Sequence, residues 1–317
     1  MSTIITDLTP RPTDMMNPQL REFFNSKDFV SNPDPNKYES CLGDDSDSLI
    51  GVAYMREAFG IQPKGFYDFN NIYVSTDFDP FKSFVGVDMS FVRQGMRCWD
   101  NHIQLRTGDE NESFNRMCAN INLYYGNNAS NQVQYQKKFA GSTAFQMYAY
   151  YDGSKPKTKE GAMLWISIDS GFKGHYNPQF KEVHNNYLEE LGTTWVIDLL
   201  NEKTYEQMVY FMNKYGLNSK IKINSFGNLY NVGKFMKQAS GEWKQGMSLN
   251  FEFISKHLGF DISLPKDKFS LHSQLHRHSM KTSDVDFNKI NEKSIISLAH
   301  TYNNQIEFTT TSENLYV

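Results

Sequence analysis

The first 48 residues constrain the fold more than any other segment, because they hold five of the ten prolines and show no sustained apolar periodicity. These prolines are Pro10, Pro12, Pro18, Pro33 and Pro35. Such a segment cannot build a core of its own, and chain ends of this composition become ordered only when something ties them down. We therefore expect residues 1–48 to form an extended N-terminal arm that lies across a neighbouring surface, which could belong to another copy of the chain.

The size and the cysteines set broad limits. The chain has 317 residues, enough for one large or two ordinary domains. Its three cysteines, Cys41, Cys98 and Cys118, are widely spaced and include no CxxC pair, which indicates reduced thiols and excludes a zinc ribbon. The N-terminus lacks the basic end and apolar run of a signal peptide, and no stretch approaches the roughly 20 apolar residues of a transmembrane span. We expect synthesis in the cytoplasm.

Charge and composition favour a protein rich in strands. The net charge is −4 and the pI is about 6.1, without a long basic block, so the sequence gives no strong nucleic-acid signal. The chain also holds 24 Phe and 18 Tyr, and aromatic residues fit the pleated, half-buried faces of strands. The pattern is typical of a mainly β protein.

Local patterns divide the chain into two β-rich blocks joined by helices. The clearest alternation is Phe145, Met147, Ala149 and Tyr151, which predicts a β-hairpin with residues 162–168. Further strands are expected over 66–74, 84–91, 102–106, 132–139, 194–199, 220–225, 248–254, 294–299 and 305–310.

Two helices interrupt this pattern. Apolar residues at helical spacing predict a connecting helix over 177–192. A second helix, 205–215, follows Thr204, whose hydroxyl can cap it while Gln207 reaches back. We expect an arm at 1–48, a β-rich domain at 49–176, the connecting helix at 177–192 and a second β-rich domain at 193–317. The fold class is tandem jelly-roll or β-sandwich blocks with short connecting helices, and the alternative is a single large α+β domain.

The histidines His272, His276 and His278 form the strongest candidate metal site. They lie within seven residues, and Asp284 and Asp286 could add carboxylates. Such a donor set suits zinc, iron or manganese in a metal-dependent hydrolase or nuclease. A polar surface loop is the simpler interpretation, because ligand spacing alone is permissive.

Other chemical motifs are weaker. The pair Asp44 and Asp45 belongs to an acidic turn that precedes the first β-rich block, and nothing in its context distinguishes it. His102 lies four residues from Cys98, but the surrounding sequence matches no nucleophile turn, so buried structural thiols are expected.

Aromatic residues offer a third possibility, a glycan- or host-surface-binding β protein. Tyrosines cluster beside Trp165, and lysines supply local positive charge. Aromatic residues at strand spacing are more often part of a core. The residues of this aromatic patch are Tyr124, Tyr125, Tyr148, Tyr150, Tyr151 and Trp165, with Lys137, Lys138, Lys155, Lys157 and Lys159.

The organisation as a whole resembles the jelly-roll subunits of icosahedral virus capsids, whose extended termini reach across neighbouring subunits. The resemblance implies a structural, self-assembling major capsid protein that forms trimers in a phage-like shell, with the virion as its location. In that hypothesis no residue does chemistry, no cofactor is needed, and the partners are other copies and other virion proteins. Assembly would depend on six apolar residues of the arm, Ile4, Ile5, Leu8, Phe23, Phe24 and Phe29.

Overall fold

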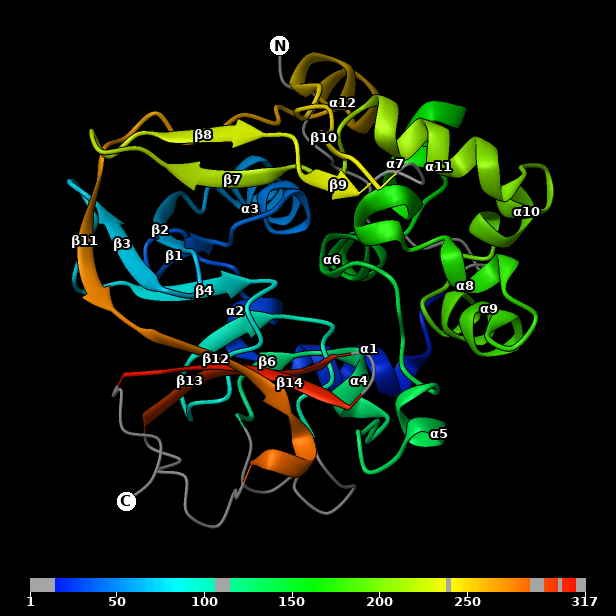
Figure 1. The fold of residues 1–317 in the computed structure, drawn as a ribbon, viewed down its shortest axis with the longest axis horizontal. Helices are drawn as coiled ribbons and strands as arrows, with labels where there is room; N and C mark the ends of the chain where they lie inside the picture. Colours follow the sequence, from blue (N-terminus) through cyan, green and yellow to red (C-terminus); the bar gives the residue numbers. More distant parts are fainter. Residues whose placement is uncertain (1–14, 106–114, 238–240, 286–293, 302–303, 312–317) are drawn as a thin grey trace.

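A mixed seven-stranded sheet forms the centre of the computed structural model (Figure 1). The structure describes residues 15–105, 115–237, 241–285, 294–301 and 304–311. The strand order is β11-β3-β2-β1-β4-β5-β6, in which β2, β1, β4, β5 and β6 are parallel. β3 and β11 extend one edge in antiparallel pairing. The strands are β1 (Tyr38–Leu42), β2 (Pro63–Tyr67), β3 (Asn71–Ser75), β4 (Ser83–Val87), β5 (Arg97–Trp99), β6 (Cys118–Ala119) and β11 (Phe269–Gln274).

The strand order places a topological switch point between β1 and β4. Helix α3 (Ser46–Phe59) carries the chain from β1 to β2 on one side, and after β3 the chain returns to place β4 on the other side of β1. Open α/β sheets bind ligands outside the carboxyl ends of their strands at such a point. A ligand site is therefore expected among the residues that follow β1 and β4.

Helix α3 packs closely on this part of the sheet. Asp45 caps its N-terminus by accepting from the Ser48 amide, and Gly60 ends it in the left-handed conformation. A Cβ atom on Gly51 would lie 2.6 Å from Cγ1 of Val87, so this glycine permits the close approach of α3 to β4. The turn between β1 and α3 is thereby fixed at the switch point.

Helices α6 to α11 lie to the right of α3 in Figure 1. Helix α6 packs against both α3 and α7. The helices are α1 (Pro18–Asn25), α2 (Asp28–Ser31), α4 (Ile121–Tyr124), α5 (Gln132–Tyr135), α6 (Thr143–Tyr151), α7 (Lys159–Ser167), α8 (Lys173–Tyr176), α9 (Lys181–Glu190), α10 (Trp195–Asn201), α11 (Tyr205–Lys214) and α12 (Phe251–Leu258). None of the described helices is long and apolar enough to cross a membrane.

Three smaller sheets come from the C-terminal third. A three-stranded sheet, β12 (His276–Lys281), β14 (Gln305–Thr310) and β13 (Ile295–Thr301), lies at the bottom of Figure 1. The buried hydroxyl of Tyr67 joins it to the central sheet through hydrogen bonds with Ser297 (2.7 Å) and Thr309 (2.6 Å). The other two sheets are hairpins, β7 (Lys220–Ile223) with β8 (Leu229–Val232), and β9 (Phe235–Lys237) with β10 (Trp243–Gln245).

The prediction of tandem jelly-roll or β-sandwich blocks is wrong. The protein is 36% helix and 25% strand, with a mixed seven-stranded sheet and several helices, which makes it an α/β fold. The expected hairpin of residues 145–151 with 162–168 consists instead of helices α6 and α7. These helices are buried on nearly every side, so apolar residues occupy most positions and a period of two appears by chance.

Burial separates the other local predictions that are confirmed from those that are wrong. The strands expected at 132–139 and 194–199 contain helices α5 and α10, and the one expected at 248–254 contains the start of α12. Strands β7, β13 and β14 confirm the predictions at 220–225, 294–299 and 305–310. Helix α11 is confirmed together with the capping box between Thr204 and Gln207, and α9 lies within the expected connecting helix. Capping residues and half-buried amphipathic segments therefore predict their secondary structure correctly, whereas fully buried helices cannot be recognised from the sequence pattern.

The N-terminal segment packs onto the protein's own core. Phe24 and Phe29 are fully buried and contact the ring of Trp99 on β5 at centroid distances of 5.4 and 6.3 Å. Phe23 is partly buried. The expected arm residues Ile4, Ile5 and Leu8 lie outside the described residues. The predicted domain boundaries and the role of the arm in assembly stay predictions.

Truncation of Phe24 tests how the N-terminal segment is held. We expect Phe24→Ala to lower the free energy of unfolding of the isolated chain by about 3–5 kcal/mol, because it leaves a cavity against Trp99. Chemical denaturation of dilute protein measures this change. Met15→Ala is the matched control, since that side chain is 52% exposed and should cost less than about 0.5 kcal/mol. Equal stability of both variants would show that Phe24 does not contribute to the core.

Candidate metal centre

Acidic residues follow the two strands at the switch point. Asp88 comes directly after β4, while Asp45 and Asp47 lie in the turn after β1 and the first turn of α3. Asp100 follows β5, the next parallel strand. Because parallel strands present their carboxyl ends at one edge, four carboxylates meet in this region.

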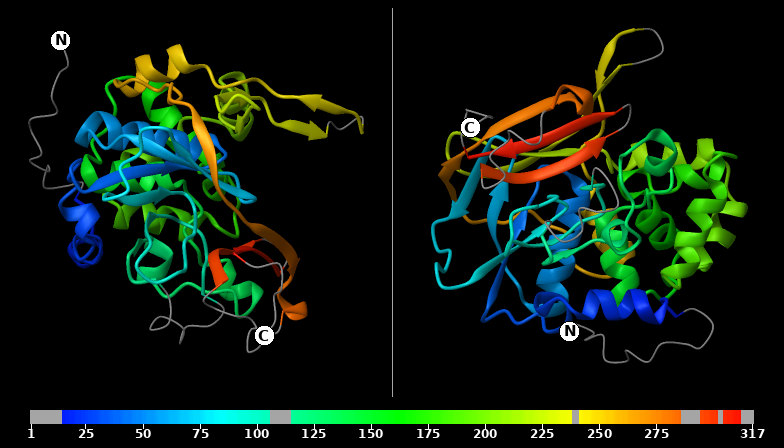
Figure 2. Two further views of the ribbon diagram at one scale, coloured as in Figure 1. Left: turned by 90° about the vertical axis from the view of Figure 1, so that its left-hand side faces the viewer. Right: turned by 90° about the horizontal axis from the view of Figure 1, so that it is seen from below.

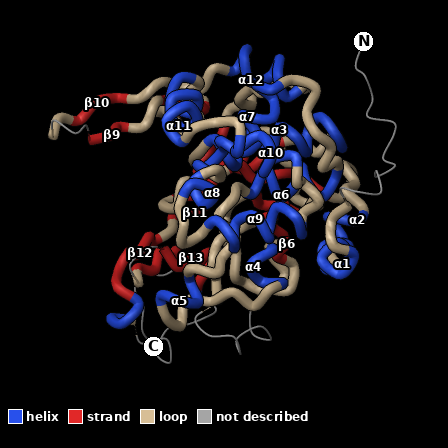
Figure 3. Tube along the Cα trace, turned by 90° about the vertical axis from the view of Figure 1, so that its right-hand side faces the viewer, coloured by secondary structure: helices blue, strands red, loops and turns tan. Residues whose placement is uncertain are grey.

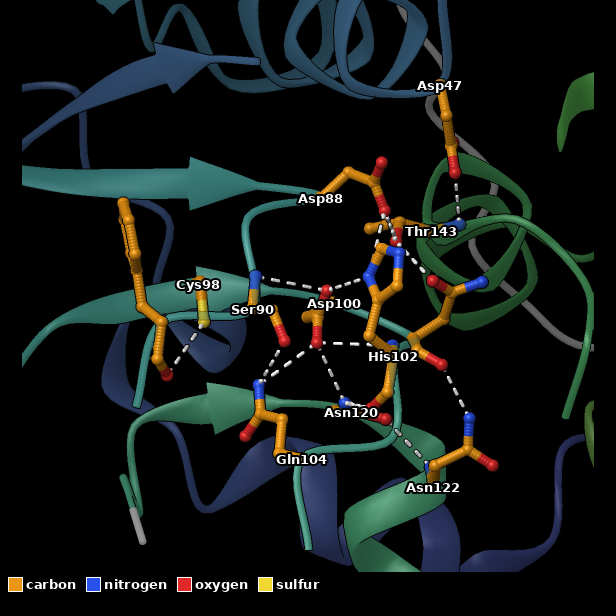
Figure 4. Close-up of polar contacts among 12 residues, drawn as sticks. Asp47, Asp88, Ser90, Cys98, Asp100, His102, Gln104, Asn120, Asn122 and Thr143 are labelled. Atoms are coloured by element: carbon orange, nitrogen blue, oxygen red, sulfur yellow. Dashed lines mark hydrogen bonds and ion pairs between the residues drawn. The ribbon is translucent and has the colours of Figure 1, made fainter. Parts of the chain in front are cut away.

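Asp100 and His102 form a hydrogen-bonded pair beside Asp88 (Figure 4). Nδ1 of His102 lies 2.7 Å from Oδ1 of Asp100 and 3.7 Å from Oδ1 of Asp88. Asp100 is completely buried, whereas the His102 side chain is 34% exposed. Part of the His102 side chain is therefore accessible to solvent, whereas the carboxylate that orients it is hidden.

Neighbouring polar groups hold Asp100 in place. Its Oδ2 accepts hydrogen bonds from Gln104 Nε2 and Asn120 Nδ2, both at 3.0 Å. The backbone amides of Ser90 and His102 also donate to this carboxylate, each at 3.2 Å. A carboxylate with five donors, counting His102 Nδ1, has little capacity left for a metal ion, so we assign it the role of positioning His102.

Helix α6 begins at the same place and fixes two more carboxylates. Asp47 is buried and accepts from the backbone amides of Thr143 and Ala144, both at 2.8 Å. The Thr143 hydroxyl donates to Asp88 Oδ1 at 2.7 Å. Asp47 therefore ties α3 to α6, and Thr143 sets the direction of the Asp88 side chain.

The backbone around the site is strained. Of the six non-glycine residues with positive φ in the described chain, four lie here: Asp88 (62°), Ser90 (53°), Asp169 (47°) and Ser170 (62°). Asp169 lies in the short 3₁₀ turn Ile168–Ser170 after α7, where its side chain is exposed. Strained conformations concentrate at functional sites, where the surrounding structure enforces them. Two of these positions, Asp88 and Asp169, carry carboxylates, and the charge of Asp169 helps to raise the pKa of Asp88.

The carboxylates repel one another. Burial raises the pKa of Asp88 to about 8, against the favourable effect of His102, and Asp45, Asp100 and Asp169 add to the rise. Nearby protein atoms remove part of the hydration of Asp169, although its side chain reaches the surface, and this loss raises its pKa; repulsion from Asp45 raises it further. Burial also raises the pKa of Asp47, with repulsion from Asp88 and Asp169. The charge on each carboxylate affects the pKa of its neighbours, so these groups titrate as one coupled set.

Basic side chains of the protein offset part of this charge, and His102 and Lys220 make the direct contacts. Burial alone would lower the pKa of His102, but Asp100 and Asp88 raise it to about 10, so the ring is an imidazolium at neutral pH. Lys220, from β7, places Nζ 2.9 Å from Asp44 Oδ1 and 3.7 Å from Asp45 Oδ2. These contacts hold the β7–β8 hairpin against the acidic turn. Six carboxylates lie around these basic groups, and the raised pKa of Asp88 shows that the site does not hold all of their negative charge at neutral pH.

The open carboxylates of this centre could hold a divalent cation. Among the described residues, the one group of three or more side chains whose ligand atoms lie within 4.8 Å of one another is Asp88, Asp100 and His102. Because Asp100 is engaged by its donors, Asp88 is the best placed ligand, with Asp45 and Asp169 nearby. Carboxylate oxygens suit magnesium or manganese better than zinc.

The three histidines singled out from the sequence lie elsewhere. His272 is exposed on β11 and contacts Ser273, while His276 and His278 lie two residues apart on β12. His278 stacks on Phe308 at 4.9 Å and bonds to Thr310. Asp286 lies outside the described residues. The histidines do not come together as a group of ligands in the described part of the chain.

The aromatic patch is largely core. Tyr148 stacks on Trp165 with ring centroids 4.3 Å apart, and both are buried, as is Tyr150. Tyr125 is the most exposed of these rings, at 39%. The patch offers little surface for a glycan or a base.

Sequence reasoning noted the acidic turn but missed the centre. Asp88 and Asp100 each follow a short apolar run that forms a strand, residues 84–87 and 98–99, whereas Asp169 follows helix α7. An acidic residue at the end of consecutive buried runs is the pattern expected of an α/β site, but it has this meaning only once the strands are known to be parallel. The assumption of antiparallel sandwiches concealed it.

The fold and the site define an α/β protein with an acidic centre at the carboxyl edge of its sheet. No family model, no curated protein and no solved structure matches the chain. The function must therefore be argued from the geometry alone.

The charge on His102 gives a testable consequence of the Asp100 contact. In metal-free protein we expect His102 to titrate near pH 10, and Asp100→Asn to lower its pKa. Since the folded pKa exceeds the unfolded value of 6.5, this group stabilises the fold fully below pH 6.5 and loses its contribution as pH rises to about 10. Nitrogen-15 NMR of the imidazoles measures both titrations.

His184 provides the internal control for that titration, because burial lowers its pKa to about 4 independently of the acidic centre. Titration of His102 near 6.5 in the parent protein, or an unchanged value in Asp100→Asn, would contradict the assigned pairing.

Proposed function

We propose that the chain is a divalent-metal-dependent hydrolase that acts on phosphoesters, with its active site at the centre formed by Asp45, Asp88, Asp169 and His102. The observation that carries the proposal is the convergence of these groups at the topological switch point, with Asp88 and Asp169 on strained backbone. A metal-dependent hydrolase or nuclease was the alternative to the capsid prediction from the sequence, but it was centred on His272, His276 and His278. The proposal moves that activity to a different set of residues.

The donor types support phosphoryl chemistry. Asp45, Asp88 and Asp169 supply hard oxygen ligands, and the magnesium and manganese ions that prefer them act mainly on phosphates. When bound, such an ion neutralises phosphate oxygens and activates a water molecule. An excess of carboxylates without an ion would instead repel an anionic substrate. We therefore expect a phosphate group to bind at this site only together with the ion.

His102 has a complementary role. Asp100 accepts from its Nδ1 and keeps the ring charged, so its other nitrogen can donate a hydrogen bond or a proton to an oxygen of the substrate. Its partial exposure leaves room for this contact. Gln104 and Asn120 act through Asp100 and are positioning residues.

The capsid prediction has lost its structural basis. It depended on jelly-roll blocks, which the α/β fold replaces. Trimer formation, association with virion proteins and a location in the virion stay predictions, as does binding to glycans or host surfaces. No observation on the described residues favours any of them over hydrolysis.

Loss of one ligand should abolish the activity. We expect the parent protein to hydrolyse bis(p-nitrophenyl) phosphate in the presence of manganese, and Asp88→Asn to reduce kcat/KM by about 100-fold or more, because charge at the transition state is then poorly stabilised. Release of p-nitrophenolate measures the rate. Glu206→Gln is the matched control, since it removes one exposed carboxylate from α11, outside the centre. Equal rates in both variants would exclude this site.

Metal binding should also appear in the stability of the fold. Manganese at about 100 times its dissociation constant should raise the free energy of unfolding by about 2.7 kcal/mol, because it binds only the folded chain. We expect Asp169→Asn to lose most of this gain and Glu206→Gln to keep it. Thermal unfolding with and without chelator measures the shift. An identical gain in all three proteins would place the ion at another site.

A further inference from the structure

The β9–β10 hairpin projects from the body of the protein. Figure 2 (left) and Figure 3 show it extending away from the helices beside α11 and α12, with no other strand alongside. Trp243 pairs with Lys237, Lys244 with Met236 and Gln245 with Phe235, and the two strands form a sheet of their own. An isolated two-stranded hairpin is only marginally stable in water. A hairpin of this form gains stability when a partner covers it.

Large aromatic side chains stand exposed on this hairpin. Trp243 is 67% exposed and Phe235 is 59% exposed. Because Gln245 is opposite Phe235 and two residues from Trp243, the two aromatic residues lie on the same face in diagonal positions, which are about 7–8 Å apart along the backbone of such a strand pair. Two rings at this spacing can stack against the faces of a planar base.

An open groove at the root of the hairpin adds positive charge. It has a volume of about 240 Å³ and includes two exposed lysines, Lys234 and Lys244, together with the amides of Asn213, Asn218 and Gln245. Its remaining lining residues are Gly216, Gly246 and Met247, so the lining contains no acidic residue. Ammonium groups and amide N–H donors together suit phosphate oxygens.

The hairpin belongs to a basic part of an acidic chain. Residues 214–281 hold eleven Lys and Arg but only four Asp and Glu, a formal charge of +7, whereas the whole chain carries −4. The remainder therefore carries −11. The net charge of the whole chain does not indicate nucleic-acid binding, because the acidic remainder masks this basic segment. A basic segment with exposed aromatic rings is the electrostatic pattern of a polyanion-binding surface.

We propose that the β9–β10 hairpin and the groove at its root bind single-stranded nucleic acid, with Phe235 and Trp243 stacking on bases and Lys234 and Lys244 contacting phosphates. Stacking requires unpaired bases, because a duplex hides their faces, so single strands are the favoured partner. The surface is separate from the acidic centre and its binding does not require hydrolysis.

Two alternative partners fit less well. The end of the hairpin includes the exposed Gly241 and Glu242, and a carboxylate there opposes insertion into an anionic membrane. The rings lie along the strands rather than at the end. Pairing with the same hairpin of a second copy would bring Lys234 and Lys244 of both chains together without an opposing charge on the lining of the groove.

Fluorescence anisotropy with a fluorescein-labelled 20-nucleotide oligothymidylate tests the proposal on the full chain, in chelator so that no hydrolysis occurs. We expect Trp243→Ala to weaken binding about tenfold, and Trp243→Phe to restore most of the affinity because it keeps an aromatic ring. The variant Lys234→Ala/Lys244→Ala should reduce the slope of log affinity against log salt by about 0.7 per lysine. Phe81→Ala and Lys256→Ala are matched controls, since both side chains are exposed outside the hairpin.

Four outcomes would overturn the proposal: no saturable binding of the oligonucleotide, equal loss in Phe81→Ala and Trp243→Ala, equal affinity for a duplex of the same length, or binding only to phosphatidylglycerol vesicles. Asp88→Asn should bind as tightly as the parent protein. Failure of the oligonucleotide test leaves the hydrolase proposal intact, because that proposal rests on manganese-dependent cleavage of a small diester.

Discussion

The structure depends on the concentration of carboxylates at the carboxyl edge of a parallel sheet. Asp45, Asp47, Asp88, Asp100 and Asp169 meet where β1, β4 and β5 end, and their mutual repulsion opposes folding. Backbone amides, a charged histidine and Lys220 stabilise these carboxylates. The same contacts join the sheet to α6 and to the β7–β8 hairpin. An arrangement that costs stability in this way is typical of a functional site.

The carboxylates differ in what their neighbours allow them to do. Asp100 is saturated by five donors and can only orient His102, and Asp47 is occupied by the first amides of α6. Asp45 caps α3 and lies 3.7 Å from Lys220 Nζ, whereas Asp88 is only partly buried and Asp169 is exposed, so these two are the better candidates to bind an ion. The same residue type therefore serves as structural anchor, as positioning group and as candidate metal ligand, and burial and hydrogen bonding decide which.

The sequence revealed local features better than the fold. The capping box at Thr204 and Gln207 and the strands β7, β13 and β14 were predictable, because capping chemistry and half-buried strands leave clear local patterns. Helices α6 and α7 were not, because residues buried all round lose helical periodicity. The wrong fold class also hid the site, because parallel strands bring Asp88 and Asp100 together and the packing of helix α7 adds Asp169, 81 positions after Asp88. The histidine cluster, by contrast, was conspicuous in sequence and is spread along β11 and β12 in space.

Anomalous diffraction from crystals grown with manganese tests the central claim most directly. The account predicts a strong anomalous peak within coordination distance of Asp88, bounded by Asp45 and Asp169, with the ring of His102 facing the same opening. A map without a peak at this centre, under conditions in which manganese occupies other carboxylates of the protein, would contradict it. The acidic residues would then be a structural network whose charge the protein itself neutralises.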